Sequence, residues 1–277
     1  MNLINSISNS RKTISSVGLL TSMPSEQDIR GVYAFKWVNN KYSGPIIKLR
    51  KSSDTTGVST KDFYMDKTGT KIGELLGGNG TSLTTWLGTD SAYVVKWYDQ
   101  STKGYNISQD SISIQPIFDY TNKRINFTAS NYLPLPFGMI RNGNYSHSIV
   151  LRIDNTNILH NQTILFYGGG GQNSYGFGCA TWNDLITYDI VGNSLGISSS
   201  KIDNKIISLI YNSSSPNTRV LSLDKSASSA SSNFGLNVQY NANNAISRIG
   251  SGDYSIYSLF VYESVLSSVD RLFIENI

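Results

Sequence analysis

The 277-residue chain contains few of the side chains that carry covalent or metal chemistry. Its only histidines are His147 and His160, and its only cysteine is Cys179. Neither a zinc-ligand spacing nor a nucleophile elbow surrounds them. A Ser–His–Asp triad stays open, because its members are distant in sequence in any fold. Calcium bound by loop aspartates and backbone carbonyls also stays open, but the expected cofactor is none.

Glycoside hydrolysis normally needs two carboxylates, one acid and one nucleophile or base. The chain has four glutamates, Glu26, Glu74, Glu263 and Glu275, so none lies between residues 75 and 262. The aspartates of that interval include Asp99, Asp154, Asp189 and Asp203. Aspartate is common at turns and strand ends for purely structural reasons. The carboxylate content therefore argues against a glycosidase.

Charge excludes further classes of partner. The net charge is only +4, and the densest basic stretch, Lys48 to Lys51, alternates in a way that predicts one solvated strand face. Nucleic-acid binding would need a broader basic cluster with stacking aromatics, so no nucleic-acid partner is expected. No apolar run reaches 18 residues, which predicts no membrane span. The first 20 residues also lack the apolar run of a signal peptide.

The elements that must position any site are predicted to be strands. Charged residues make up 15% of the chain, its polarity comes from Ser, Thr and Asn, and it contains 17 Tyr, a composition that favours strands and turns. Apolar residues alternate with period two in eleven segments: Val32–Val38, Ile46–Arg50, Ala92–Tyr98, Ser113–Phe118, Ser146–Ile153, Thr163–Tyr167, Leu185–Val191, Lys205–Tyr211, Arg219–Leu223, Ala245–Gly250 and Ser255–Tyr262. Short strands separated by Gly, Asn and Ser loops predict an all-β, two-sheet antiparallel sandwich.

Two short helices are expected. One covers Lys71 to Leu76, and the other follows Ser267, whose spacing from Asp270 resembles a capping box. The four glycines 168–171 predict a hairpin loop, since no Lys and hydroxyl follow as a phosphate loop requires. The Ser/Ala-rich segment 226–232 predicts an exposed loop tip. No linker is evident, so we expect an arm at residues 1–28 and a single sandwich domain at 29–277.

Two stretches carry a resemblance to a known family. The first is the run YSGPIIKLRKSSD at 42–54, with Gly44, Pro45 and Arg50, and the second is VVKWYDQS at 94–101. The second contains the motif Trp97, Tyr98, Asp99 and Gln100. Both resemble the amino-terminal half of the α-L-arabinofuranosidase B catalytic domain, a concanavalin-A-like sandwich of a type that recurs in virus and phage structural proteins. Residues 256–274 resemble the last strand and closing helix of laminin-G-like jelly rolls. The resemblance implies a concanavalin-A-like jelly roll, in which the second motif is expected to be architectural.

The departures from that family bear on activity. Its enzymes carry a catalytic Glu two residues after an Asp on a central strand. The best-matching strand here keeps Asp189 and places Val191 at the nucleophile position, and the family's adjacent cysteine pair is missing. Valine cannot attack an anomeric carbon, so the resemblance implies the fold without the hydrolysis. We expect no catalytic residue and no enzyme activity.

Three functions remain to be compared. The first is a structural or attachment protein of a virus particle, capsid-associated or fibre-like, whose arm at 1–28 binds other virion proteins. The second is a lectin-like, glycan-binding module, located extracellularly if not on a virion. Its candidate ligand-binding residues are Trp182, Tyr188 and Asp189, with Trp182 favoured because Gly, Asn and Asp surround it. The third and least favoured is an active glycosidase.

Overall fold

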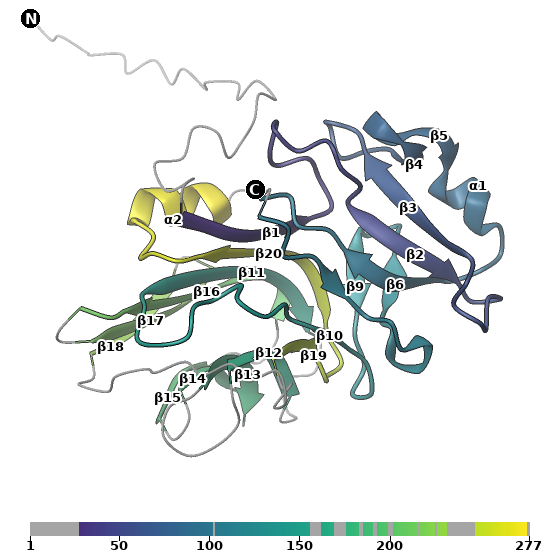
Figure 1. The fold of residues 1–277 in the computed structure, drawn as a ribbon. Coiled ribbons are helices and arrows are strands. Elements are labelled where there is room, and N and C mark those ends of the chain that lie inside the picture. Colours follow the sequence, from purple (N-terminus) through teal and green to yellow (C-terminus); the bar gives the residue numbers. More distant parts are fainter. Residues whose placement is uncertain are drawn as a thin grey trace, which may run out of the picture.

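The computed structural model describes residues 28–101, 103–155, 162–168, 176–182, 185–190, 193–198, 202–214, 217–224, 226–231 and 247–275. It consists of two antiparallel sheets with two short α-helices, which confirms the predicted all-β sandwich (Figure 1). The arm expected at residues 1–28 lies outside the described residues except for Asp28.

The larger sheet has the strand order β18-β17-β16-β11-β20-β9-β8-β6-β2-β3-β4-β5, and β1 and β7 pair with β20 and β6 off this path. Its strands, in chain order, are β1 Ile29–Ala34, β2 Ile47–Lys51, β3 Thr60–Met65, β4 Ile72–Leu75, β5 Asn79–Ser82, β6 Ala92–Trp97, β7 Ile107–Ser108, β8 Ile117–Asp119, β9 Arg124–Asn126, β11 His147–Asn155, β16 Ile202–Asn212, β17 Thr218–Leu223, β18 Ser226–Ser231 and β20 Ser255–Tyr262. The helix α1, Leu83–Leu87, follows β5 at the β2–β5 end of the sheet (Figure 1).

The smaller sheet has the order β10-β19-β12-β13-β14-β15. Its strands are β10 Tyr132–Pro134, β12 Gln162–Gly168, β13 Gly176–Trp182, β14 Leu185–Ile190, β15 Asn193–Ser198 and β19 Arg248–Gly250. It faces the β16–β11–β20 part of the larger sheet (Figure 1). One apolar cluster fills the space between the sheets, with Ile149 and Leu259 from one side and Leu165 and Tyr188 from the other, each fully buried. Sheet-on-sheet burial of this kind is the main stabilising term of a sandwich.

A second, smaller core covers the outer face of the larger sheet. The helix α2, Ser268–Glu275, packs Ile274 there against Val150, Phe260 and Val32. Its start is capped as expected, because the Ser267 hydroxyl accepts a hydrogen bond from the Asp270 amide at 3.1 Å.

The central strand β20 is shared by two neighbours on one edge. Residues 258–262 pair with β1, the last pair being Ala34 with Ser258, whereas Ile256 pairs with Ile125 of β9. On its other edge, Arg152 of β11 pairs with Ser258 and Ile153 with Ile256, so Tyr257 is the extra residue of a β-bulge. The sheet therefore forks at Tyr257, and we refer to this place as the fork.

Several sequence predictions were wrong in detail. Residues 72–75 form strand β4, paired with β3, rather than a helix, and Gly77 (φ 76°) reverses the chain behind it. Residues 226–231 form strand β18 rather than a loop tip, because their backbone completes the ladder of β17. Of Ser113–Phe118, only the end is strand, since residues 112–114 form a 3-10 turn. Strand β1 ends at Ala34 instead of Val38, because the Gln100 side chain replaces a strand partner beyond that point.

Candidate functional site

The motif at 97–100 joins β6 to β1. Asp99 Oδ1 accepts hydrogen bonds from the Val32 and Ser101 amides at 2.9 and 2.8 Å, and its Oδ2 accepts one from the Tyr105 amide at 3.1 Å. The Asp99 side chain contacts backbone donors, as expected, and has no hydrogen bond to Arg50. Gln100 donates to the Ala34 carbonyl at 2.8 Å and accepts from the Val38 amide at 3.2 Å. These contacts satisfy backbone groups where β1 ends.

The other motif residues are also packed into the framework. Trp97 is fully buried and stacks on Phe35, with ring centroids 5.1 Å apart. Tyr98 donates its hydroxyl proton to Asp62 at 2.7 Å, and Arg50 donates to the Gln115 side chain at 2.8 Å. In the first run, the Tyr42 hydroxyl reaches over Gly44 to the Pro45 carbonyl, 2.5 Å away. A Cβ on Gly44 would lie 2.5 Å from that hydroxyl, so a larger residue there would displace the end of the Tyr42 side chain.

The three ligand-binding candidates on β13 and β14 do not form an open site among the described residues. Tyr188 is fully buried between the sheets, where its hydroxyl lies 2.9 Å from Nε2 of His147. Asp189 accepts from the Thr187 hydroxyl at 2.8 Å, while its Oδ1 is buried without a hydrogen bond to any described residue. Only the backbone of Trp182 is described, and Val191 lies outside the described residues. The Tyr188 ring is therefore closed off from the surface, and its expected role in ligand binding stays a prediction.

His147 lies at the centre of this buried polar and aromatic group. Its ring stacks on Phe177, with centroids 4.2 Å apart, and on Tyr211 at 5.5 Å. Burial lowers the pKa of His147 to about 4, although the Tyr145 backbone offsets part of the effect. Burial likewise raises the pKa of the Cys179 thiol well above its usual range. The imidazole is therefore neutral and the thiol protonated at pH 7, so neither is poised for catalysis on a surface ligand.

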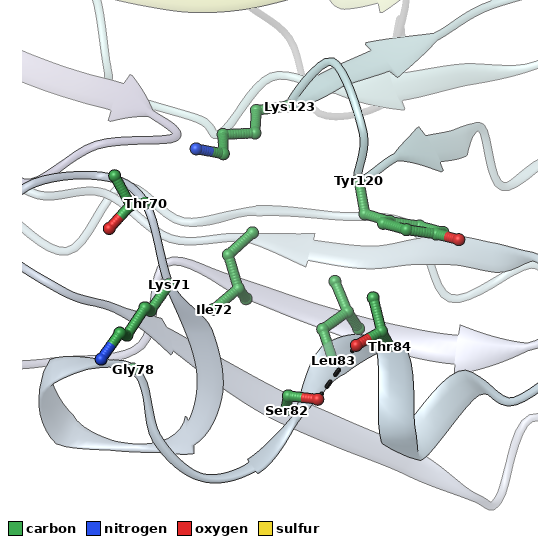
Figure 2. Close-up of a pocket in the computed structure, with 9 residues that line it drawn as sticks. All are labelled: Thr70, Lys71, Ile72, Gly78, Ser82, Leu83, Thr84, Tyr120 and Lys123. Carbon is green, nitrogen blue, oxygen red and sulfur yellow. Dashed lines mark hydrogen bonds between the residues drawn. The ribbon is translucent and has the colours of Figure 1, made fainter.

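An open cavity lies instead between the β8–β9 turn and the β4–α1 region (Figure 2). It encloses about 260 Å³. We call it the Tyr120 cavity, and its lining residues are Thr70, Lys71, Ile72, Gly78, Ser82, Leu83, Thr84, Tyr120 and Lys123. Figure 2 shows Ile72 and Leu83 at its base, with Lys123 and Tyr120 extending over it from the opposite side.

Local structure fixes the rim of the Tyr120 cavity. Partial burial raises the pKa of Asp66, but hydrogen bonds from Thr68, Thr70 and Lys71 outweigh it and lower that pKa to about 2. The amides of Thr70 and Lys71 lie 2.8 and 3.0 Å from the Asp66 Oδ1, which holds this turn in place. On the other side, Lys123 has a left-handed backbone (φ 53°), as the tight β8–β9 turn requires.

The Tyr120 cavity offers an apolar base, a partly exposed ring and several hydrogen-bonding groups. Tyr120 is 41% exposed, so part of this residue is accessible to a ligand. The Ser82 and Thr84 hydroxyls lie 3.0 Å from each other at the rim. None of the lining residues carries a carboxylate. This arrangement can hold a hydroxyl-rich ligand against an aromatic ring, but it contains no acid–base pair.

Two further cavities adjoin the fork. The fork cavity, about 150 Å³, is lined by Ala34, Phe35, Lys36, Asn122, Lys123, Arg152, Tyr257 and Ser258, and it shares Lys123 with the Tyr120 cavity. The other, about 260 Å³, contains two carboxylates, Asp154 and Asp253, beside Arg124. Asp154 is paired with Arg124 at 2.7 Å.

Sequence reasoning missed Tyr120, Lys123 and Tyr257. The only available signal was a tyrosine and a lysine among turn residues at 119–124, which many surface turns share. Within the described ranges, no group of three or more His, Cys, Asp or Glu side chains could hold a metal ion. No helix in the described part of the chain is long and apolar enough to cross a membrane.

Comparison with known proteins supplies a fold relationship. No protein-family model and no curated protein matches the chain. Among solved structures, a GH54 α-L-arabinofuranosidase soaked with a cyclic sulfate inhibitor aligns with a TM-score of 0.61 and 12% identity, over 90% of this chain and 62% of that one. An arabinofuranosidase complexed with arabinofuranosyl-α-1,2-xylobiose gives 0.60 and 11%, over 90% and 61%. The chain thus spans about 62% of the length of the arabinofuranosidase structure. At such identities the likeness shows the fold alone, and the chain shares the β-sandwich architecture of these enzymes.

Proposed function

We propose that this chain is a non-catalytic, glycan-binding β-sandwich. The observation that carries the proposal is the Tyr120 cavity, in which a partly exposed ring lies over an apolar base beside hydroxyl and ammonium groups. Sugars present apolar C–H faces and a rim of hydroxyls, so they bind where an aromatic ring and a few polar groups converge. A monosaccharide-sized ligand fits about 260 Å³.

The test is glycan-array binding followed by calorimetry on the best ligand. Tyr120→Ala should weaken that ligand about tenfold, because losing about 60 Å² of apolar contact with the ring costs about 1.5 kcal/mol. Tyr145→Ala is a matched control, since Tyr145 has a similar exposure (44%) and lines none of the three cavities described above. An equal loss in both variants, or unchanged binding in Tyr120→Ala, would contradict the proposal.

Absence of hydrolysis is part of the same proposal. It is supported by the carboxylate-free lining of the Tyr120 cavity and by Val191 at the position that the family resemblance gives to the nucleophile. The cavity with Asp154 and Asp253 favours the alternative, because two carboxylates are the minimum for a glycosidase. Purified protein should give no turnover of nitrophenyl arabinofuranoside or other nitrophenyl glycosides between pH 4 and 8. Turnover by the wild type that disappears in Asp253→Asn or Asp189→Asn would contradict this proposal and show that the chain is a glycosidase.

We also propose, from the sequence alone, that the protein is an attachment or capsid-associated protein of a virus particle. The support for this proposal is the resemblance to modules of virus and phage structural proteins and the polar composition of residues 1–28. Deleting residues 1–25 should leave the sandwich folded while weakening particle incorporation or oligomerisation. An unfolded deletion product would mean that these residues belong to the sandwich. Absence of the protein from a virion proteome would contradict its proposed role in a virus particle.

A further inference from the structure

The fork leaves space on the outer face of the larger sheet. Beyond Ala34, β1 no longer pairs with β20, and β9 pairs with β20 only at Ser255 and Ile256. Because Tyr257 is a bulge residue, it and Ser258 both oppose Arg152 and both line the fork cavity. A bulge of this kind re-aims a side chain and interrupts pairing, and it recurs beside binding sites.

Positive charge gathers around this space. Lys36, Lys123 and Arg152 line the fork cavity, and none of its lining residues is acidic. The Arg152 guanidinium lies 5.8 Å from the centre of the Tyr257 ring. Lys123 donates to the Gly69 carbonyl, which leaves other protons of its ammonium group for a ligand. The lining of the fork cavity therefore combines three cations with the rings of Phe35 and Tyr257.

Two acidic side chains near the fork, Asp119 and Asp154, are paired with an arginine. Arg124, whose guanidinium lies 5.9 Å from the centre of the Tyr257 ring, binds Asp119 at 3.1 Å and Asp154 at 2.7 Å. Both carboxylates are thus engaged by Arg124. Neither carboxylate lines the fork cavity.

Lys36 is the residue of the fork cavity that most favours an anionic ligand. Among the described residues its ammonium group has no hydrogen bond and no ion pair, although the side chain is half-buried. Burial, and then the charge of Arg152, lower the pKa of Lys36. A bound anion would remove both penalties, since it supplies the hydrogen-bond acceptor and the opposite charge that the Lys36 ammonium group lacks among the described residues.

We propose that the fork cavity binds the carboxylate or sulfate group of an acidic glycan, with a neighbouring sugar in the Tyr120 cavity. This inference rests on the proposed glycan-binding function, because Lys123 lines both cavities and so connects them. The size agrees: about 150 Å³ is the space of roughly five water molecules, enough for one such group and part of its ring.

The experiment compares three tetrasaccharides by calorimetry at low and high salt: a heparin-derived one for sulfate, tetragalacturonate for carboxylate, and a neutral arabinan fragment. The wild type should bind one of the acidic probes at least tenfold more tightly than the neutral one, and salt should reduce the difference. Lys36→Gln should weaken binding of the acidic probe about tenfold, as expected for the loss of one charge-assisted hydrogen bond. It should leave binding of the neutral probe unchanged. Lys36→Arg should restore binding of the acidic probe. Lys103→Gln, a change at an exposed lysine outside the three cavities, should have less than a twofold effect.

Other outcomes separate the two proposals. Equal binding of acidic and neutral probes, or unchanged acidic binding in Lys36→Gln, overturns the acidic ligand and leaves glycan binding intact. If no tetrasaccharide binds, glycan binding fails, and inorganic sulfate then tests the anion site alone. Sulfate should shift the NMR amide signals of Lys36, Lys123 and Tyr257 in the wild type but not in Lys36→Gln, and unchanged signals would overturn that site too. Tighter binding of single-stranded DNA, lost in Lys36→Gln, would assign the cavity to nucleic acid instead.

Discussion

The buried His147 makes the stability of the sandwich depend on pH in a defined window. In the unfolded chain the imidazole has its ordinary pKa of 6.5, whereas burial lowers the pKa to about 4 in the folded protein. Between these values the unfolded state binds a proton that the folded state does not. Lowering the pH therefore favours unfolding, and the stability is fully present only above pH 6.5.

The size of the effect follows from the two pKa values. They differ by about 2.5, and at 1.36 kcal/mol per pH unit the free energy of unfolding should fall by about 3 kcal/mol between pH 6.5 and 4. Asp66, whose folded pKa is about 2, contributes at lower pH, because its stabilisation is lost only as the pH falls below about 4. The two windows are therefore separable.

The assay is urea denaturation at half-unit steps from pH 7.5 to 4, in a His160→Gln background so that His147 is the only histidine. The variant His147→Gln keeps a hydrogen-bonding group opposite Tyr188 and removes the titration. Its free energy of unfolding should be lower at pH 7 but nearly flat down to pH 4. Equal slopes in the two proteins, or an NMR titration of His147 with a pKa above 6, would refute the reasoning.

Three further predictions concern the framework. Asp99→Ala should lower the free energy of unfolding by about 1.5–3 kcal/mol or more, because its carboxylate accepts hydrogen bonds from several backbone amides. Its glycan affinity should be unchanged. Lost glycan binding at an unchanged melting temperature would instead mean that Asp99 contacts the ligand. Gly250→Ala should lower the free energy of unfolding, measured by urea denaturation, by more than about 1 kcal/mol, because Gly250 has φ 117° and a Cβ would lie 2.6 Å from the Tyr132 Cα. An unchanged free energy would mean that the backbone around Gly250 shifts without cost to admit the Cβ. Ser267→Ala should cost about 1 kcal/mol through the lost cap of α2, and Ser267→Asp should not, which thermal unfolding can compare.

The sequence predicted the class of fold and most central strands, because burial on one or both faces imposes a regular apolar pattern. Residues 255–262 are strand β20 with the predicted bounds. The apolar pattern did not predict strands that are held mainly by backbone hydrogen bonds to a neighbouring strand. The segment 226–231 has almost no apolar content, yet its backbone hydrogen-bonds to β17, and β4 is held by β3 despite helical spacing of its apolar residues.

The candidate site was less accessible to prediction. Asp99 could be assigned to backbone donors because it follows a strand within a specific motif. Tyr188, in contrast, was expected to contact a ligand, and only the register of β14 shows that it is buried between the sheets. The fork cavity joins residues from β1, the β8–β9 turn, β11 and β20. No spacing within the chain indicates that these four segments meet, because a bulge and the end of a strand pairing create the space.

The position of β20 also has a consequence for how the chain folds. Its partners include Ile29 in β1, Ile125 in β9 and Val150 in β11, so the middle of the larger sheet joins segments more than a hundred residues apart in sequence. Bringing such segments together costs loop entropy before any contact compensates for it, and folding is correspondingly slow. Until residues 255–262 have left the ribosome, β1 and β11 each lack a neighbour and expose apolar faces. During synthesis the larger sheet therefore lacks its central strand, and its exposed apolar faces favour aggregation until β20 has been synthesised.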